Sequence, residues 1–199
     1  MIVAHAPLRL SFGGGGTDLP AYYERYGGLV VSSAIGDACH VRLEQHAGND
    51  VLIRSLDYRK STVVRAREAI TLEEPLSLPR AVLLWFEQVT RRPSGITITM
   101  EADVAPGSGL GSSSAMTVAL VSAIAQHLRI PISKHEIAAA ACEIEIDILG
   151  HPIGRQDQYA SALGGLNVLS FSSGSVEVKP LNLPAGIKRS LQDHLLLLS

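Results

Sequence analysis

A run of glycines and serines between a strand-like and a helix-like segment constrains this chain most strongly. The run reads Pro106-Gly-Ser-Gly-Leu-Gly-Ser-Ser-Ser-Ala115. Before it, residues 96–100 alternate like a strand, and the residues after it, to about Arg129, are typical of a helix. Glycines let the backbone approach a ligand closely. Because the first N–H groups of a helix are unpaired, the pattern predicts an anion site at this junction.

The anion that best fits such a loop is a nucleotide phosphate. The run has no lysine of the GxxxxGKS/T type, so it is not a Walker loop. A Rossmann GxGxxG belongs in a first βα turn with an acidic residue about 20 positions on, which also does not fit. The remaining alternative is a flexible loop with a serine N-cap, which the alternating glycines followed by serines disfavour.

The rest of the chain mixes strands and helices without regular βαβ alternation, which favours an α+β fold. Helices are expected over 18–25, 78–91, 112–129 and 133–149. Asp18 is a possible N-cap of the first helix, and Ser133 with Glu136 forms a capping box for the last. Strands are expected over 3–12, 28–35, 38–45, 51–55, 61–65, 96–100, 165–171 and 176–181.

Composition excludes several classes of protein. The 199 residues are 46% hydrophobic, and the net charge of −2 comes without any block of basic residues, so nucleic acid is not an expected partner. No apolar run is long enough to span a membrane, and the N-terminus does not resemble a signal peptide. The two isolated cysteines, Cys39 and Cys142, and histidines without metal-ligand spacing indicate a cytoplasmic protein without structural zinc.

The chain ends in the apolar run QDHLLLLS. Domain ends are seldom so apolar, so we expect this run to begin a buried strand of a further, truncated domain. On this interpretation the first domain covers 1–186 and the start of the second covers 187–199. A native end that packs in a core is the alternative.

The motif Pro106-x-x-x-Gly-Leu-Gly-Ser-Ser-Ser resembles the second signature of the GHMP kinase family. The resemblance implies the two-layer, ribosomal-protein-like N-terminal domain of that family, with ATP and Mg²⁺ as cofactors. It further implies that Ser113 reaches the Mg²⁺ ion. The ATP-binding residues it implies are Pro106, Gly107, Ser108, Gly109, Leu110, Gly111, Ser112, Ser113 and Ser114.

A second resemblance lies near the N-terminus. The segment Ala6-Pro-Leu-Arg9, followed by a glycine run and Thr17-Asp18, is similar to the first GHMP signature, in which an Asp nine residues after a basic residue binds sugar hydroxyls. An Arg offers planar donors to oxygen, and an Asp accepts from hydroxyls. By itself Arg9 is more typical of an exposed strand position. The resemblance implies a sugar site formed by Gly15, Gly16, Thr17 and Asp18.

The residues of this first signature indicate which sugar is the acceptor. Galactokinases carry Gly-Glu-His-Thr-Asp, whereas this chain has Gly14-Gly-Gly-Thr-Asp18. The Gly-Gly-Gly-Thr-Asp-Leu-Pro form resembles heptose 7-phosphate kinases and the kinase part of fucokinases. We therefore expect the acceptor to be the anomeric hydroxyl of D-glycero-D-manno-heptose 7-phosphate. A fucose or galactose kinase, and a sugar-binding relative that has lost catalysis, are the alternatives.

The third cluster reads Gly154-Arg-Gln-Asp-Gln-Tyr159. Phosphoryl transfer to an alcohol needs a positioned proton acceptor, and the resemblance assigns that role to Asp157. Capping of a turn is the alternative. Arg155 is a candidate ligand for the phosphate of the acceptor, because arginine binds phosphate through two parallel bonds. A surface arginine is the alternative there.

The predicted helix before this cluster carries Glu143, Glu145 and Asp147. At helical spacing Glu143 and Asp147 share one face, while Glu145 lies among apolar neighbours. A carboxylate on an apolar face is unfavourable unless it is paired or bound to a metal, so Glu145 is the expected Mg²⁺ ligand together with Ser113. The other two acids are expected to be solvated.

Taken together, these patterns predict an ATP-dependent sugar kinase with a small-molecule sugar phosphate as its substrate. Arg9 is expected to hold the nucleophile and stabilise developing charge, and Asp157 to accept its proton. The isolated 199-residue chain is expected to be poorly active, and a homo-oligomer is compatible with the sequence.

Overall fold

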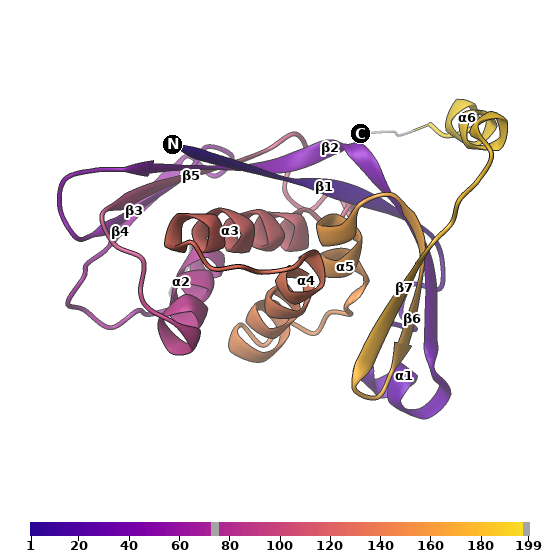
Figure 1. Cartoon of the computed structure of the whole chain (residues 1–199), viewed down its shortest axis with the longest axis horizontal. Coiled ribbons are helices and arrows are strands. Elements are labelled where there is room, and N and C mark those ends of the chain that lie inside the picture. The colour runs from indigo at the N-terminus through magenta and orange to yellow at the C-terminus, as the bar shows by residue number, and fades with distance from the viewer. Residues whose placement is uncertain (73–75, 197–199) are drawn as a thin grey trace.

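The computed structural model describes residues 1–72 and 76–196. In this part of the chain one sheet of seven strands is covered on one face by helices (Figure 1). The strands are β1 (Ile2–Gly13), β2 (Gly28–Gln45), β3 (Val51–Ser55), β4 (Lys60–Val64), β5 (Ile96–Ala102), β6 (Leu166–Ser172) and β7 (Ser175–Pro180). Their order is β4-β3-β5-β2-β6-β7, with β1 also paired to β2. The expected α+β, two-layer architecture is confirmed.

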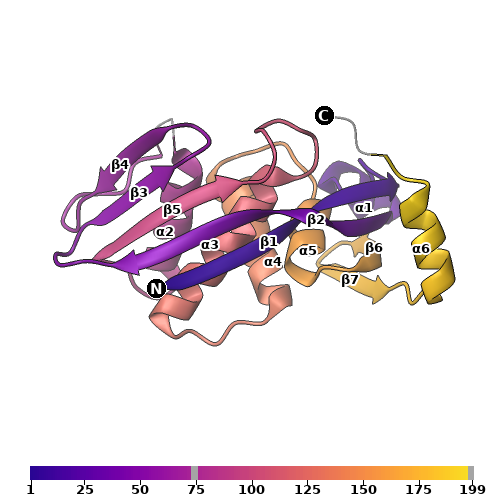
Figure 2. The same cartoon turned by 90° about the horizontal axis from the view of Figure 1, so that it is seen from above.

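The helices divide into a central group and two peripheral ones. The central group is α2 (Ser77–Val89), α3 (Ser112–Leu128), α4 (Lys134–Cys142), the π-helix η1 (Glu143–Ile148) and α5 (Gln156–Leu163). The peripheral ones are α1 (Pro20–Tyr26) and α6 (Ala185–Asp193). Figures 1 and 2 show α3 under the middle of the sheet, with α2 on one side and α4 and α5 on the other.

Helix α3 is the centre of the core. Its residues from Ser114 to Val121 are all buried, so the helix is covered on every side rather than on one face. A helix that is apolar all round must lie inside a domain. Its contacts with β1 and β2 fix the position of its N-terminus, at which the glycine and serine run lies.

The longest strand corrects one prediction. Two strands were expected over 28–35 and 38–45, but β2 runs unbroken through both. It pairs with β1 along its length, while residues 28–33 also pair with β6 and residues 39–45 with β5. The register shifts between Pro7 and Arg9, where the single β1 residue Leu8 lies opposite the β2 residues 35–37, so β2 bulges around Gly36 instead of ending there (Figure 2).

Three further expectations about local structure have mixed outcomes. The capping box of Ser133 and Glu136 is confirmed, but the helix it opens turns into the π-helix η1 at Glu143. Asp18 is not the N-cap of α1. That position is Leu19, and the Asp18 carboxylate instead accepts hydrogen bonds from the nearby N–H of Gly16 and from two N–H groups of the distant Gln156.

The C-terminal strand was wrongly predicted for the residues described. Gln192 and Asp193 belong to α6, residues 194–196 form no strand, and residues 197–199 lie outside the described part of the chain. Helix α6, which precedes these residues, has no buried residue. Within residues 1–72 and 76–196, no helix combines the length and apolarity needed to cross a membrane.

Candidate active site

The glycine and serine run forms a loop that turns into the first turn of α3. Gly107, Gly109 and Gly111 have φ angles of 82°, 77° and 76°, a region that other residues rarely adopt. Gly111 is the N-cap residue and has no side chain to satisfy the first N–H groups of α3. These groups stay available for an anion, so the predicted phosphate site has the required geometry.

Arg9 holds this loop against α5. Its Nε donates to Asp157 Oδ1 and its Nη2 to Asp157 Oδ2, both at 2.6 Å. Its Nη1 donates to the carbonyl of Gly109 at 2.8 Å, and its backbone N–H donates to the carbonyl of Leu110 at 3.1 Å. The Asp157 side chain is 22% exposed. The proposed base is therefore fixed in one orientation but still reachable from outside.

Glu145 lies at the centre of a second cluster of hydrogen-bonded side chains, separate from the Arg9–Asp157 pair. It is completely buried, and Ser113 Oγ donates to its Oε1 at 2.8 Å while Gln158 Nε2 donates to its Oε2 at 2.7 Å. Burial raises the pKa of Glu145, and hydrogen bonds from Ser114, Ser113 and Gln158 act against that rise. Among the described residues it has no ion-pair partner.

The donor set of this second cluster fits a magnesium ion. A carboxylate and a hydroxyl supply the hard oxygen ligands that Mg²⁺ prefers, and phosphate oxygens of a nucleotide would complete them. A buried carboxylate without a cation is unfavourable, so this position favours a positive ligand. Ser113 and Glu145 would hold the ion. Within residues 1–72 and 76–196, no three or more His, Cys, Asp or Glu side chains are grouped so that they could hold a metal ion.

The neighbouring acids behave as expected. Glu143 and Asp147 are both exposed, and Glu143 also accepts a hydrogen bond from Trp85 Nε1 at 2.9 Å. The π-helix keeps Glu145 on the opposite side from these two residues, pointing to α3 and α5. Of the three carboxylates, only Glu145 is buried, as its apolar neighbours in the sequence predicted.

In the predicted sugar loop, the side chains of Thr17 and Asp18 are already hydrogen-bonded within the protein. Asp18 is 2% exposed and accepts hydrogen bonds from Gly16 N, Gln156 N and Gln156 Nε2 at 3.0, 3.1 and 3.3 Å. The Thr17 hydroxyl donates to the carbonyl of Gly14 and accepts from the N–H of Leu29. Asp18 thereby brings the loop of residues 13–18, including Gly15 and Gly16, next to the turn that carries Asp157.

Arg155 lies in that same turn and is half-buried. Its guanidinium lies over the ring of Tyr23, with the central carbon 5.7 Å from the ring centroid. Its Nε is buried and has no hydrogen-bond partner among the described residues. A cation with an unused donor beside the sugar loop is suited to an anionic ligand.

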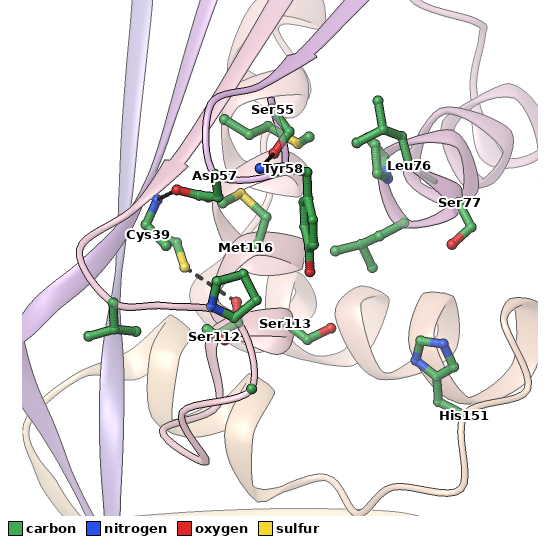
Figure 3. A pocket seen from close by; sticks show the side chains of 17 residues that line it. Cys39, Ser55, Asp57, Tyr58, Leu76, Ser77, Ser112, Ser113, Met116 and His151 are labelled. Atoms are coloured by element: carbon green, nitrogen blue, oxygen red, sulfur yellow. Dashed lines mark hydrogen bonds between the residues drawn. The ribbon is translucent and has the colours of Figure 1, made fainter. Parts of the chain in front are cut away.

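A cavity of about 310 Å³ opens on the other side of the phosphate loop. Figure 3 shows Tyr58 and Leu76 across this cavity from Ser112 and Ser113, with His151 near its rim. Cys39 also lines it and donates to the carbonyl of Ser112, and burial raises the pKa of this thiol to about 12. Sequence reasoning missed Tyr58, Leu76 and His151, because they come from separate elements and belong to no local motif.

Comparison with known proteins agrees with this geometry. Residues 77–165, which include the phosphate loop, Glu145 and Asp157, match the family model described as the GHMP kinases N terminal domain. Residues 77–165 belong to the N-terminal domain of the GHMP kinases. The expected family is thus confirmed for the segment that holds most of the candidate site.

Three proteins similar to this domain have names that describe sugar kinases, and several others are named mevalonate kinases. A D-glycero-alpha-D-manno-heptose 7-phosphate kinase of Campylobacter jejuni is 32% identical over 193 residues, which cover 96% of this chain and 57% of the relative. The crystal structure of a D-glycero-D-manno-heptose 1-phosphate kinase from Bacteroides thetaiotaomicron superposes with a TM-score of 0.88 and 32% identity, covering 94% of this chain and 62% of that one. An L-fucokinase/L-fucose-1-P guanylyltransferase of Bacteroides fragilis is 27% identical over 218 residues, covering 98% of this chain and 22% of the relative. The chain therefore spans less than two thirds of each of these proteins.

Proposed function

We propose that this GHMP kinase domain is the ATP- and sugar-binding part of a sugar kinase. The acceptor in this proposal is the anomeric hydroxyl of D-glycero-D-manno-heptose 7-phosphate. The observation that carries the proposal is the Arg9–Asp157 ion pair, which lies directly against the phosphate loop at Gly109 and Gly111. A fixed carboxylate beside a phosphate site is the arrangement that transfer of a phosphoryl group to an alcohol requires.

On the donor side, the loop of residues 106–111 and the first turn of α3 bind the phosphates of ATP through unpaired N–H groups. The cavity lined by Tyr58 and Leu76 receives the adenine ring of ATP. When bound at Ser113 and Glu145, Mg²⁺ neutralises charge on the phosphate oxygens. Pro106, Ser108, Leu110 and Ser114 complete the loop.

On the acceptor side, Asp157 takes the proton of the attacking hydroxyl. Arg9 holds the planar carboxylate of Asp157 in one orientation, and each of its oxygens still has a lone pair free to accept. The same guanidinium stabilises the negative charge that develops on the attacking oxygen. The sugar lies against the exposed Gly15 and Gly16, and the internal hydrogen bonds of Thr17 and Asp18 hold this loop in place. The predicted direct contact of the buried Asp18 carboxylate with sugar hydroxyls is therefore not part of this proposal.

The phosphate already present on the heptose is the reason to favour this sugar. Arg155 is only partly buried and follows Gly154, which packs against Asp18 of the sugar loop, so its guanidinium is a suitable partner for that phosphate. Both heptose kinase relatives are similar over nearly the whole chain. The fucokinase relative also covers nearly all of it, so fucose is the second candidate.

Phosphorus NMR of product formation tests the proposal. The chain, and the full-length protein that contains it, would be given ATP, Mg²⁺ and either heptose 7-phosphate, fucose or galactose. We expect a new anomeric phosphate on the heptose, none with Asp157→Asn, and an undiminished signal with Asp147→Asn, a control that changes an exposed carboxylate nearby. Product from fucose or galactose alone would keep the kinase and reject the heptose. A folded full-length protein that yields no product from any acceptor would refute the kinase assignment.

A further inference from the structure

Gln158 is a buried polar residue that the proposed chemistry does not use. It follows Asp157 directly in the first turn of α5 and is completely buried. Asp157 points to Arg9 on β1, whereas Gln158 points to Glu145 on η1. One turn of α5 thus connects the carboxylate of the proposed base site with the carboxylate of the proposed metal site.

The orientation of the Gln158 amide follows from its partner. Nε2 donates to Glu145 Oε2 at 2.7 Å. Turning the amide over would bring its oxygen against an oxygen of the ionised carboxylate, the form that binds a cation, and neither atom could then donate. In the observed orientation Oε1 is buried and has no hydrogen-bond partner in the described part of the chain. An unpaired buried carbonyl is unfavourable, so packing alone does not account for a glutamine here.

The hydrogen bond from Gln158 Nε2 orients the Glu145 carboxylate. Oε2 is occupied by Gln158, so Oε1 is the oxygen that faces Ser113, at 2.8 Å. Ser113 in turn lines the cavity beside the phosphate loop. Hydrogen bonds from residues behind a metal ligand commonly fix its orientation and its affinity for the metal. The two oxygens proposed to hold Mg²⁺ are therefore held side by side by a residue that does not touch the ion.

We propose that Gln158 is a positioning residue that orients Glu145 for a divalent cation bound together with a nucleotide. The inference rests on the proposed function, because the cation and the nucleotide belong to it. A residue that only fills space in α5 would affect stability alone. A residue that orients the metal ligand affects the part of nucleotide affinity that depends on Mg²⁺.

Isothermal titration of the 199-residue chain with a non-hydrolysable ATP analogue separates these roles. Each variant is titrated once with Mg²⁺ and once with EDTA, and the ratio of the two dissociation constants gives the enhancement by Mg²⁺. We expect Gln158→Met, which keeps the volume but loses the donor, to lower this enhancement by about 10- to 100-fold. The affinity in EDTA is expected to stay unchanged.

Ser161→Ala is the matched control. Ser161 is also buried in α5, and its hydroxyl also has no hydrogen-bond partner in the described residues, but it does not contact Glu145. We expect this variant to keep the full enhancement. If Gln158→Met does not fold, as judged by circular dichroism, Gln158→Asn replaces it, since the amide is kept but lies one methylene short of Oε2.

The outcomes separate this inference from the proposed function. A folded Gln158 variant with the enhancement of the wild type would overturn the inference and leave the kinase proposal intact. A parallel weakening with Mg²⁺ and with EDTA would also overturn it, since that is the result of a general structural role. A folded wild-type chain that binds no nucleotide under either condition would overturn the proposed function and the inference with it.

Discussion

Arg9 and Asp157 are 148 positions apart in the sequence and form an ion pair with two hydrogen bonds, both 2.6 Å long. The pair joins the edge of β1 to the first turn of α5, and a third bond from Arg9 reaches the carbonyl of Gly109. Because arginine and carboxylate are both planar and forked, this arrangement fixes the carboxylate in distance and in angle. The phosphate loop and the proposed base are thereby held in one rigid unit.

Replacement of either partner is expected to reduce turnover more than binding. Asp157→Asn removes the proton acceptor, so we expect kcat of the full-length protein to fall by about 10²- to 10⁴-fold. Arg9→Lys keeps the charge but loses the fork, so kcat is expected to fall as well, with little change in KM for ATP. Steady-state kinetics measure both. An Arg9→Lys enzyme as fast as the wild type would show that the paired geometry is not needed.

Gly111 and Gly107 form a matched pair of tests for the phosphate loop. Both have φ near 80°, so alanine at either one strains the backbone by about 1–2 kcal/mol. A Cβ at Gly111 would also lie 3.0 Å from Asp157 Oδ2, whereas one at Gly107 would meet nothing within 4 Å. We expect Gly111→Ala to lower both the melting temperature and kcat further than Gly107→Ala does. Thermal unfolding and kinetics of the two variants, compared side by side, check this, and equal effects would contradict it.

Glu145→Gln is expected to affect stability and metal binding in opposite directions. Burial raises the pKa of Glu145 in the folded chain, so the folded state binds this proton more tightly than the unfolded state does. The stability of the wild type therefore falls as pH rises above the ordinary range of glutamate. A neutral glutamine avoids this loss, and Ser113 can turn its hydroxyl to accept from the new amide.

Thermal unfolding without metal across a range of pH checks this expectation. The variant should melt higher than the wild type at pH 7, and the difference should vanish in acid, where Glu145 is protonated. A gain of about 1 kcal/mol corresponds to about 2–4 °C in a domain of this size. The same variant should lose the enhancement of nucleotide binding by Mg²⁺. A variant that melts lower than the wild type at pH 7 would contradict the assumed cost of the buried charge.

Replacement of Arg155 tests whether the acceptor sugar carries a phosphate that this residue binds. Arg155→Met removes the cation proposed for the phosphate of the heptose, and a hydrogen-bonded charge of this kind contributes about 1.5–3 kcal/mol. We expect KM for heptose 7-phosphate to rise by about 10- to 100-fold, with KM for ATP unchanged. Arg25→Met, on the adjacent helix α1, is the control for loss of a nearby charge. Equal KM values for all three proteins would reject a phosphate contact at Arg155.

Local patterns predicted most elements of the fold because short-range physics determines them. The Ser133–Glu136 capping box and the strand before the phosphate loop were both identified correctly. The failures occurred where distant partners decide the outcome. β2 continues past Gly36 because β1 supports it on one side, and Asp18 leaves the end of α1 because Gln156 competes for its carboxylate.

For the candidate site, the sequence alone determined the chemistry of its parts. Glycines and serines at a strand-to-helix junction predict an anion site, and a carboxylate among apolar neighbours predicts a cation ligand. Only the tertiary structure decided which parts meet. The pairing of Arg9 with Asp157, the bond of Gln158 to Glu145 and the cavity lined by Tyr58 all join residues from separate elements. Such contacts depend on how β1, α3 and α5 pack around one core, and no local spacing in the chain encodes that packing.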